Sequence, residues 1–279
     1  MHIGQINTFS VIKHVDFGVY LDGGELGEIL LPSREVPEGC QAGDQVQAFL
    51  YNDSRDRLIA TTTTPLAQVG DLVRLKVLDV NPVGAFLDWG LPKDLLVPKS
   101  EQVESMQIGR SYLVYVALDA PGGRIFASTK LDRFFSARQV GVQEGELVDL
   151  VITERSEVGY RAVVNKLCFG LLYENEVYEP LEIGQQTKGY VKSLRLDGKL
   201  DLSLQKPGYD KVLQAKETIV RVLEHNGGVL QITDKSSPQH IHSLFGCSKK
   251  TYKQAVGALY KARRVRIESD GLYLTTKAD

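Results

Sequence analysis

The chain has 279 residues, of which 43% are hydrophobic and 24% are charged, and its formal net charge is −2. These fractions are typical of soluble globular proteins of two or more domains, and no apolar run is long enough to span a bilayer. The sequence therefore predicts a cytoplasmic protein with no membrane partner. Its three cysteines lie outside any C-x-x-C spacing, which argues against a disulfide framework and a structural zinc site.

The small net charge conceals two parts of opposite sign. From Lys206 to the C-terminus there are 13 basic and 7 acidic residues, whereas the preceding part has 20 basic and 28 acidic residues. A basic excess is an electrostatic indication of nucleic-acid binding, and an acidic stretch by itself is not. We therefore expect the two parts to face different partners.

A glycine pattern occurs three times in the N-terminal part. The first two copies are offset by 66 residues, and the third keeps the glycines but replaces the proline by tyrosine: Gly4, Gly18, Pro32 and Gly43; Gly70, Gly84, Pro98 and Gly109; Gly145, Gly159, Tyr173 and Gly184. Because glycine enters positive-φ conformations without steric cost, fixed spacing indicates fixed backbone turns. The pattern predicts three small modules, over residues 1–65, 66–135 and 136–206.

Each of the first two copies consists of short segments of β-forming residues separated by turn residues. The predicted strands are 11–15, 19–22, 29–32, 45–52 and 57–63 in the first copy, and 71–80, 85–88, 95–98, 111–118 and 124–129 in the second. About five strands in roughly 60 residues match the five-stranded Greek-key barrel of the OB fold. The N-terminal part is therefore predicted to be mainly β.

The motifs on these strands resemble the S1 RNA-binding domain. The second strands read Phe17-Gly-Val-Tyr-Leu21 and Val83-Gly-Ala-Phe-Leu87, and the last strands read Arg57-Leu-Ile-Ala-Thr61 and Arg124-Ile-Phe-Ala-Ser128. The third copy is the most diverged, with Val158-Gly-Tyr-Arg-Ala162 and Lys199-Leu-Asp-Leu-Ser203. The resemblance implies three tandem OB-fold barrels of the S1 type.

The resemblance also implies which side chains meet nucleic acid. In S1 domains, exposed aromatic residues stack on unpaired bases, and a basic residue of the last strand meets the backbone. The corresponding residues are Phe17, Tyr20 and Arg57 in the first copy and Phe86 and Arg124 in the second, with Trp89 as an additional platform. For Trp89, packing inside the barrel or between repeats is an equal alternative. In the third copy, Arg161 stands in place of the second aromatic residue.

The C-terminal part, residues 207–279, changes to helical periodicity. Apolar residues recur at helical spacing over 212–223, before Asn226-Gly-Gly228. Ser236-Ser-Pro238 predicts the start of a second helix that closes at Gly246, and Ser248 is expected to cap a third helix that runs through Arg264. Segments 265–268 and 272–275 are expected to form a hairpin. Three helices and a hairpin predict an α+β winged-helix domain.

The predicted third helix carries a basic face. At about 100° per residue, five basic residues fall within about 120° of arc, opposite the apolar side: Lys249, Lys250, Lys253, Lys261 and Arg264. A solvated helix face normally mixes charge signs, and residues 248–267 contain seven basic residues and no acid. The pattern favours phosphate binding over a solvated face. Gly257 lies within the basic face, and either close approach of a ligand or packing explains it.

The ordered arrangement of three S1-like copies and this tail, with Ser248-Lys-Lys-Thr-Tyr252 and Leu259-Tyr-Lys261, resembles the bacterial conserved virulence factor B family. The resemblance covers essentially the full chain. It implies RNA binding and an influence on the expression of other genes. The predicted function is that of a non-catalytic regulator that binds single-stranded RNA through its barrels and its winged helix.

Two other functions stay open. The winged helix could serve a transcription regulator that binds duplex DNA, or the acidic barrels could form a scaffold for ribosomal or nuclease proteins. An enzyme is not predicted, since the sequence has neither a phosphate-cradling G-x-x-x-x-G-K-[ST] motif nor a G-x-S-x-G elbow. No cofactor or metal is expected, because His240 and His242, as alternate residues, do not face one another on a helix.

Overall fold

The computed structural model describes residues 1–119, 123–138, 141–174, 177, 180–206, 209–233 and 236–275. Strands dominate these residues, with helices concentrated near the C-terminus. The chain divides into two compact units. One contains Met1–Gly141, Asp149–Thr187 and Arg195–Leu200, and the other contains Val142–Val148, Lys188–Leu194 and Asp201–Asp279.

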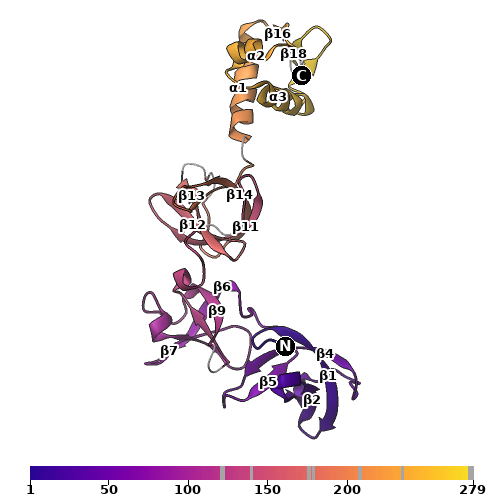
Figure 1. The fold of residues 1–279 in the computed structure, drawn as a ribbon, viewed down its shortest axis with the longest axis vertical. Coiled ribbons are helices and arrows are strands. Elements are labelled where there is room, and N and C mark those ends of the chain that lie inside the picture. The colour runs from indigo at the N-terminus through magenta and orange to yellow at the C-terminus, as the bar shows by residue number, and fades with distance from the viewer. Residues whose placement is uncertain are drawn as a thin grey trace. The chain divides into compact units, whose positions relative to one another are not determined.

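The first five strands form a closed barrel in the order β1-β2-β3-β5-β4 (Figure 1). Their bounds are β1 Ile6–Val15, β2 Gly18–Asp22, β3 Glu28–Pro32, β4 Gln45–Asn52 and β5 Leu58–Thr61. The parallel pairing of Leu30 with Ile59 closes the barrel, and the alternate side chains that point inward are buried. This is the strand order expected for an OB-type barrel from five short strands.

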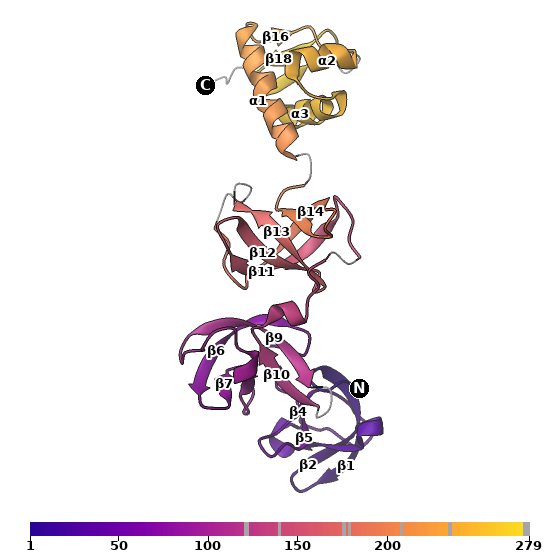
Figure 2. The same cartoon turned by 60° about the vertical axis from the view of Figure 1, so that its left-hand side comes forward.

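The second group of strands repeats this order as a five-stranded sheet, β10-β9-β6-β7-β8 (Figure 2). Its strands are β6 Leu72–Val80, β7 Gly84–Leu87, β8 Leu95–Pro98, β9 Ser111–Asp119 and β10 Arg124–Ser128. Here β8 and β10 are the two ends of the sheet, so the sheet order lacks the hydrogen-bonded pairing that closes the first barrel.

The third group of strands forms another closed barrel, the third barrel, with the order β11-β12-β13-β15-β14. Its strands are β11 Leu147–Arg155, β12 Gly159–Val164, β13 Cys168–Tyr173, β14 Gln186–Leu194 and β15 Leu200–Ser203. This order is that of the first barrel with each strand number raised by ten. The three strand groups thus share one succession of strands.

The recurring glycines have a common structural cause in the second strand of each group. A Cβ atom there would lie 2.1, 2.2 and 2.0 Å from the carbonyl oxygens of Leu31, Val97 and Leu172, for Gly18, Gly84 and Gly159 respectively. No residue with a side chain fits such a close approach of the neighbouring strand. The glycine spacing predicted backbone turns with positive φ, but at these three positions the close contact with the neighbouring strand is the physical reason for glycine.

The C-terminal elements are α1 Tyr209–His225, α2 Pro238–Phe245 and α3 Lys249–Lys261, with a sheet of order β16-β18-β17. Its strands are β16 Val229–Leu230, β17 Val265–Ile267 and β18 Leu272–Leu274. The three helices share a buried core that includes Ile219, Ile241 and Leu259. None of the helices in the described residues is long and apolar enough to cross a membrane.

The helix caps follow the sequence. Ser237 accepts a hydrogen bond from the backbone N–H of His240, and Ser248 accepts one from Thr251. Gly246 ends α2 in the left-handed conformation, as expected for a C-terminal glycine. The prediction that the third helix runs through Arg264 is wrong, because α3 ends at Lys261 and Arg263 has a φ of 56°. Arg264 therefore follows the helix rather than belonging to it.

Candidate nucleic-acid interface

The first barrel presents two aromatic side chains beside its β1–β2 turn. Phe17 is 56% exposed, and its ring centroid lies 6.3 Å from that of the half-buried Tyr20 in an edge-to-face arrangement. The Nζ atom of Lys13 lies 5.0 Å from the Tyr20 centroid and 2.6 Å from a carboxylate oxygen of Glu28. The structure thus brings the predicted pair together and adds a lysine that sequence reasoning missed.

Arg57 lies in the β4–β5 turn and is engaged by a carboxylate. Its Nη2 and Nε atoms lie 2.7 and 2.9 Å from Oδ2 of Asp53. Partial burial acts to raise the pKa of Asp53, but hydrogen bonds from Arg57 and from backbone N–H groups lower it overall. A phosphate that contacts Arg57 would therefore compete with Asp53.

A groove of about 760 Å³ lies over the second sheet and the β4–β5 turn of the first barrel. Phe86 and Arg124, both predicted site residues, line it. Asp56 of the turn reaches into the same groove, where its carboxylate lies 3.1 Å from Nη2 of Arg124 and 3.3 Å from Nζ of Lys93. The structure therefore brings the predicted residues together, but it also supplies an acid from the preceding barrel.

The charged lining of this groove is mixed. Three basic residues, Lys93, Arg124 and Arg133, face four acidic ones, Asp56, Asp94, Glu101 and Asp119. Burial raises the pKa of Asp94, and the negative charges of Asp88 and Asp79 raise it further. The groove is accordingly a poor electrostatic match for a phosphate chain.

Trp89 does not serve as an exposed stacking platform. Its side chain borders the groove but is only 3% exposed, and its ring centroid lies 5.6 Å from that of Phe49 and 6.4 Å from that of Tyr51. Its indole N–H donates to the backbone oxygen of Lys93. The prediction of an additional base platform at Trp89 is corrected, because Trp89 packs against aromatic side chains of the first barrel.

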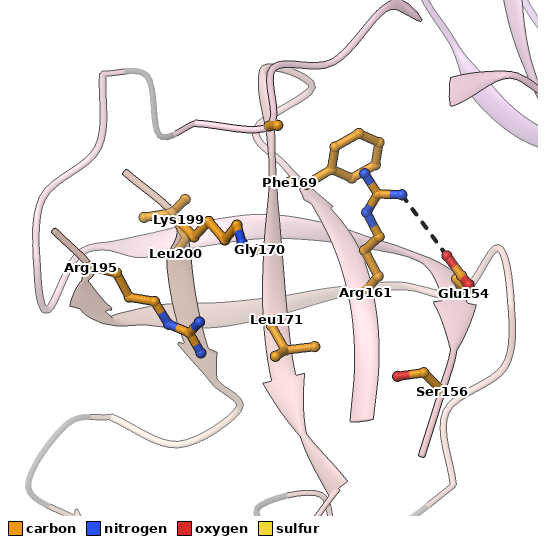
Figure 3. Close-up of a pocket in the computed structure, with 10 residues that line it drawn as sticks. Glu154, Ser156, Arg161, Phe169, Gly170, Leu171, Arg195, Lys199 and Leu200 are labelled. Atoms are coloured by element: carbon orange, nitrogen blue, oxygen red, sulfur yellow. Dashed lines mark ion pairs between the residues drawn. The ribbon is translucent and has the colours of Figure 1, made fainter. Parts of the chain in front are cut away.

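A pocket of about 260 Å³ lies in the third barrel and is lined by three basic side chains around an apolar floor. Figure 3 shows the Arg161 guanidinium beside the Phe169 ring, with Arg195 and Lys199 across Leu171 from it. The central carbon of the guanidinium lies 3.6 Å from the Phe169 ring centroid, a cation–π contact. Glu154 is the one acidic residue of the lining.

Carboxylates hold Arg161 in place. Asp132 accepts hydrogen bonds from the guanidinium, and these bonds lower the pKa of Asp132. An oxygen of Glu154 lies 3.9 Å from Nη1 (Figure 3). The Arg161 side chain remains one-third exposed. It is thus oriented by its neighbours and still reaches the pocket.

Strand register shows that the three copies use equivalent positions differently. Tyr20 pairs with Leu30, Phe86 with Leu96, and Arg161 with Leu171, so Arg161 occupies the aromatic position of the first two copies. Lys199 and Arg57 each lie directly before the last strand of their copy, and Arg124 is the first residue of the last strand of its copy. Sequence reasoning missed Lys199, although the alignment of Lys199-Leu-Asp-Leu-Ser203 with the other last strands contains that signal.

The winged helix carries the predicted basic face with one change. Lys250, Lys253 and Lys261 are exposed on α3, and Arg264 is exposed just beyond it. Lys249 is half-buried, and its ammonium donates to the backbone oxygen of Ser236 at 2.9 Å. Lys249 is therefore less suited to contact a phosphate than Lys250, Lys253 and Lys261 are, since its ammonium group already donates a hydrogen bond to Ser236.

Comparisons with known proteins match both parts of the chain. The S1 domain family matches residues 3–63 and 69–130, and the CvfB-like winged helix domain family matches residues 217–274. YitL of Bacillus subtilis is 30% identical in an alignment that covers 98% of this chain and 94% of that protein. The chain belongs to the conserved virulence factor B family.

The comparisons also found two further similar proteins. Conserved virulence factor B of Staphylococcus haemolyticus is 26% identical over 99% of this chain and 95% of its own length. A crystal structure of a multidomain protein with nucleic-acid-binding domains from Streptococcus pneumoniae is 24% identical, with a TM-score of 0.40 over 98% of each chain. The family matches show that this chain combines S1 domains and a winged helix, which are nucleic-acid-binding types of domain.

Proposed function

We propose that this protein is a non-catalytic RNA-binding regulator that acts after transcription and binds single-stranded RNA. The pocket of the third barrel carries the proposal, because Arg161, Arg195 and Lys199 surround an apolar floor there. Cationic side chains bind phosphate oxygens, and the planar faces of an arginine or an aromatic ring accept a stacked base. A single strand offers both chemical groups at once.

Unpaired RNA is favoured over duplex by the kind of surface that the barrels present. Phe17 and Tyr20 offer ring faces beside Lys13, and duplex bases are already stacked on one another. The proposal includes a third S1-type barrel and the division into modules 1–65, 66–135, 136–206 and 207–279. The nucleic-acid-binding type of the matched domains supports a role without catalysis.

A second candidate is binding of duplex DNA, and the exposed lysines of α3 favour it. Titration of the full chain with an unstructured RNA and with duplex DNA of equal length, over the same salt series, separates the two. We expect tighter RNA binding at each salt concentration, with log affinity falling by about 0.7 per phosphate contact for each unit of log salt. Tighter binding of the duplex would contradict the proposal.

The regulatory part requires a separate measurement in cells. Transcript half-lives and promoter activities are compared with and without the gene. We expect changed half-lives for bound transcripts at unchanged promoter activity. Changed promoter activity at constant half-lives would instead support the DNA-binding candidate.

A further inference from the structure

Gly257 lies in the interior of α3, where glycine is the least favourable residue after proline. A Cβ atom built on Gly257 would meet no atom within 4 Å other than its chain neighbours and the backbone of its own helix, so packing does not require the glycine. Its φ lies outside the positive range that L-residues avoid, so the backbone conformation does not require it either. Of the two explanations that the sequence leaves open, close approach of a ligand is the one that fits.

The position of Gly257 on the helix supports this explanation. At about 100° per residue, Lys250, Lys253 and Lys261 lie within about 40° of Gly257 around the helix axis. The buried residues of α3, Tyr252, Ala255, Val256 and Leu259, lie on other sides of the helix. The glycine thus stands at the centre of the exposed basic arc.

An exposed aromatic ring lies one turn further along. Tyr260 is 56% exposed, and it follows Gly257 by three residues. Side chains of a helix lean towards its N-terminus, so the Tyr260 side chain leans towards the turn that contains Gly257. A bare stretch of backbone, an aromatic ring and cations are therefore adjacent on one face.

We infer that Gly257 and Tyr260 form a docking notch for one nucleotide of a single-stranded RNA. The base stacks on Tyr260, and the sugar-phosphate chain crosses the bare helix backbone at Gly257. Lys253 and Lys261, on either side, meet the neighbouring phosphates. The inference rests on the proposed function and assigns part of the strand to a definite place on α3.

Gly257→Ala in the full chain tests the notch, because it adds one methyl group to the gap and leaves every charge unchanged. Alanine favours the helix, so we expect a higher melting temperature. We also expect affinity for an unstructured, fluorescently labelled RNA to fall by about fivefold or more, since the methyl group occupies the space of the strand. A variant that folds better and binds less well cannot owe its loss to misfolding.

Gln214→Ala is the matched control, since Gln214 is an exposed residue of α1 outside the basic face. It should leave RNA affinity unchanged. Gly257→Gln extends the series, and the larger side chain should weaken binding more than alanine does. Equal RNA affinity of wild type, Gly257→Ala and Gly257→Gln would overturn the inference.

Tyr260 is tested by two replacements. Tyr260→Ala removes the ring and should weaken RNA binding by roughly 5- to 150-fold, the range of one lost base stack. Tyr260→Phe keeps the ring and should bind as wild type does. An equal loss in both variants would show that the hydroxyl acts instead of the ring, and no loss in either would also overturn the notch.

The wild-type titration distinguishes failure of the notch from failure of the proposed function. If wild type binds RNA and the Gly257 and Tyr260 variants bind equally well, only the notch is refuted. If wild type binds duplex DNA and no single-stranded RNA, both proposals are refuted.

Discussion

The second sheet and the third barrel present equivalent strands to their cavities, β7, β8 and β10 in one and β12, β13 and β15 in the other. Where the groove of the second sheet has Phe86, the pocket of the third barrel has Arg161. The residue two positions before the strand partner, Leu96 or Leu171, is Asp94 in the second sheet and Phe169 in the third barrel. At these two positions the second sheet has an aromatic ring and then an acid, whereas the third barrel has a base and then an aromatic ring.

This difference changes the charge of the cavity while the strand order is kept. Four acidic residues line the groove of the second sheet, and one lines the pocket of the third barrel. Both are lined by three basic residues, so the difference lies in the acids. Repeated strands therefore fix where a ligand is held, and a few side chains decide whether an anionic ligand is favoured.

Trp89→Ala should have the largest effect on the free energy of the protein, because it removes a buried aromatic side chain that borders the groove of the second sheet. Burial against Phe49 and Tyr51 predicts a loss of about 3–5 kcal/mol in the free energy of unfolding. Phe86→Ala, in the same groove but half-buried, should cost less stability. Thermal and denaturant unfolding measure both variants, and an unchanged melting temperature for Trp89→Ala would contradict its role in packing.

Arg161→Ala/Lys199→Ala should have the next largest effect, since it removes two of the three basic side chains that line the pocket of the third barrel and leaves Glu154 in place. We expect RNA affinity to fall by about 3 kcal/mol, roughly 150-fold. The slope of log affinity against log salt should decrease by about 1.4, which corresponds to two phosphate contacts on a single strand.

Arg57→Ala/Arg124→Ala is the matched double variant of the first two copies. Basic residues of both double variants are ion-paired, Arg57 and Arg124 with Asp53 and Asp56, and Arg161 and Lys199 with Asp132 and Asp197. Arg124 lies among four acidic lining residues, whereas the pocket of the third barrel has one, so we expect a smaller loss of RNA affinity. Equal losses in the two double variants would break the comparison between the groove and the pocket. Melting temperatures of both variants serve as the control for folding.

Much of the fold could be predicted from the sequence because its causes are local. The predicted strand 29–32 corresponds to Glu28–Pro32, and the predicted strand 85–88 to Gly84–Leu87. Turn glycines and alternating apolar residues act within a few positions of one another, so the strands of a copy can be predicted from the sequence of that copy alone. Serine caps and a helix-stopping glycine likewise located α2.

The sites depend on contacts between distant residues and were harder to predict. Trp89 is buried by side chains of the preceding barrel, and Arg124 lies 68 residues from its partner Asp56. Neither contact leaves a local pattern. Lys199 is different, because its alignment with Arg57 and Arg124 could have identified it from the sequence alone.

Phe86→Ala and Tyr20→Ala test whether the first two copies contribute stacking in spite of their acids. Each should cost about 1–3 kcal/mol of RNA affinity and leave the salt slope nearly unchanged, because no charge is removed. RNA titration is paired with thermal melting of each variant. A lower melting temperature with unaltered affinity of the folded protein would assign the ring to packing instead of stacking.

Asp56→Asn should have the smallest effect and the opposite sign. Asp56 has a φ of 57°, a left-handed conformation that asparagine also adopts readily, so the change removes the charge without straining the turn. It releases Arg124 and Lys93 from their carboxylate partner and makes the groove more like the pocket of the third barrel.

Because exposed ion pairs contribute about 0.2–1 kcal/mol, we expect RNA binding to strengthen by roughly 1.5- to 5-fold and the salt slope to become steeper. Glu104→Gln, at an exposed residue outside the lining of the groove and of the pocket, controls for the change in net charge alone. If both variants gained equally, the effect would be one of overall charge. A gain confined to Asp56→Asn would show that this carboxylate competes with RNA phosphates for the two cations.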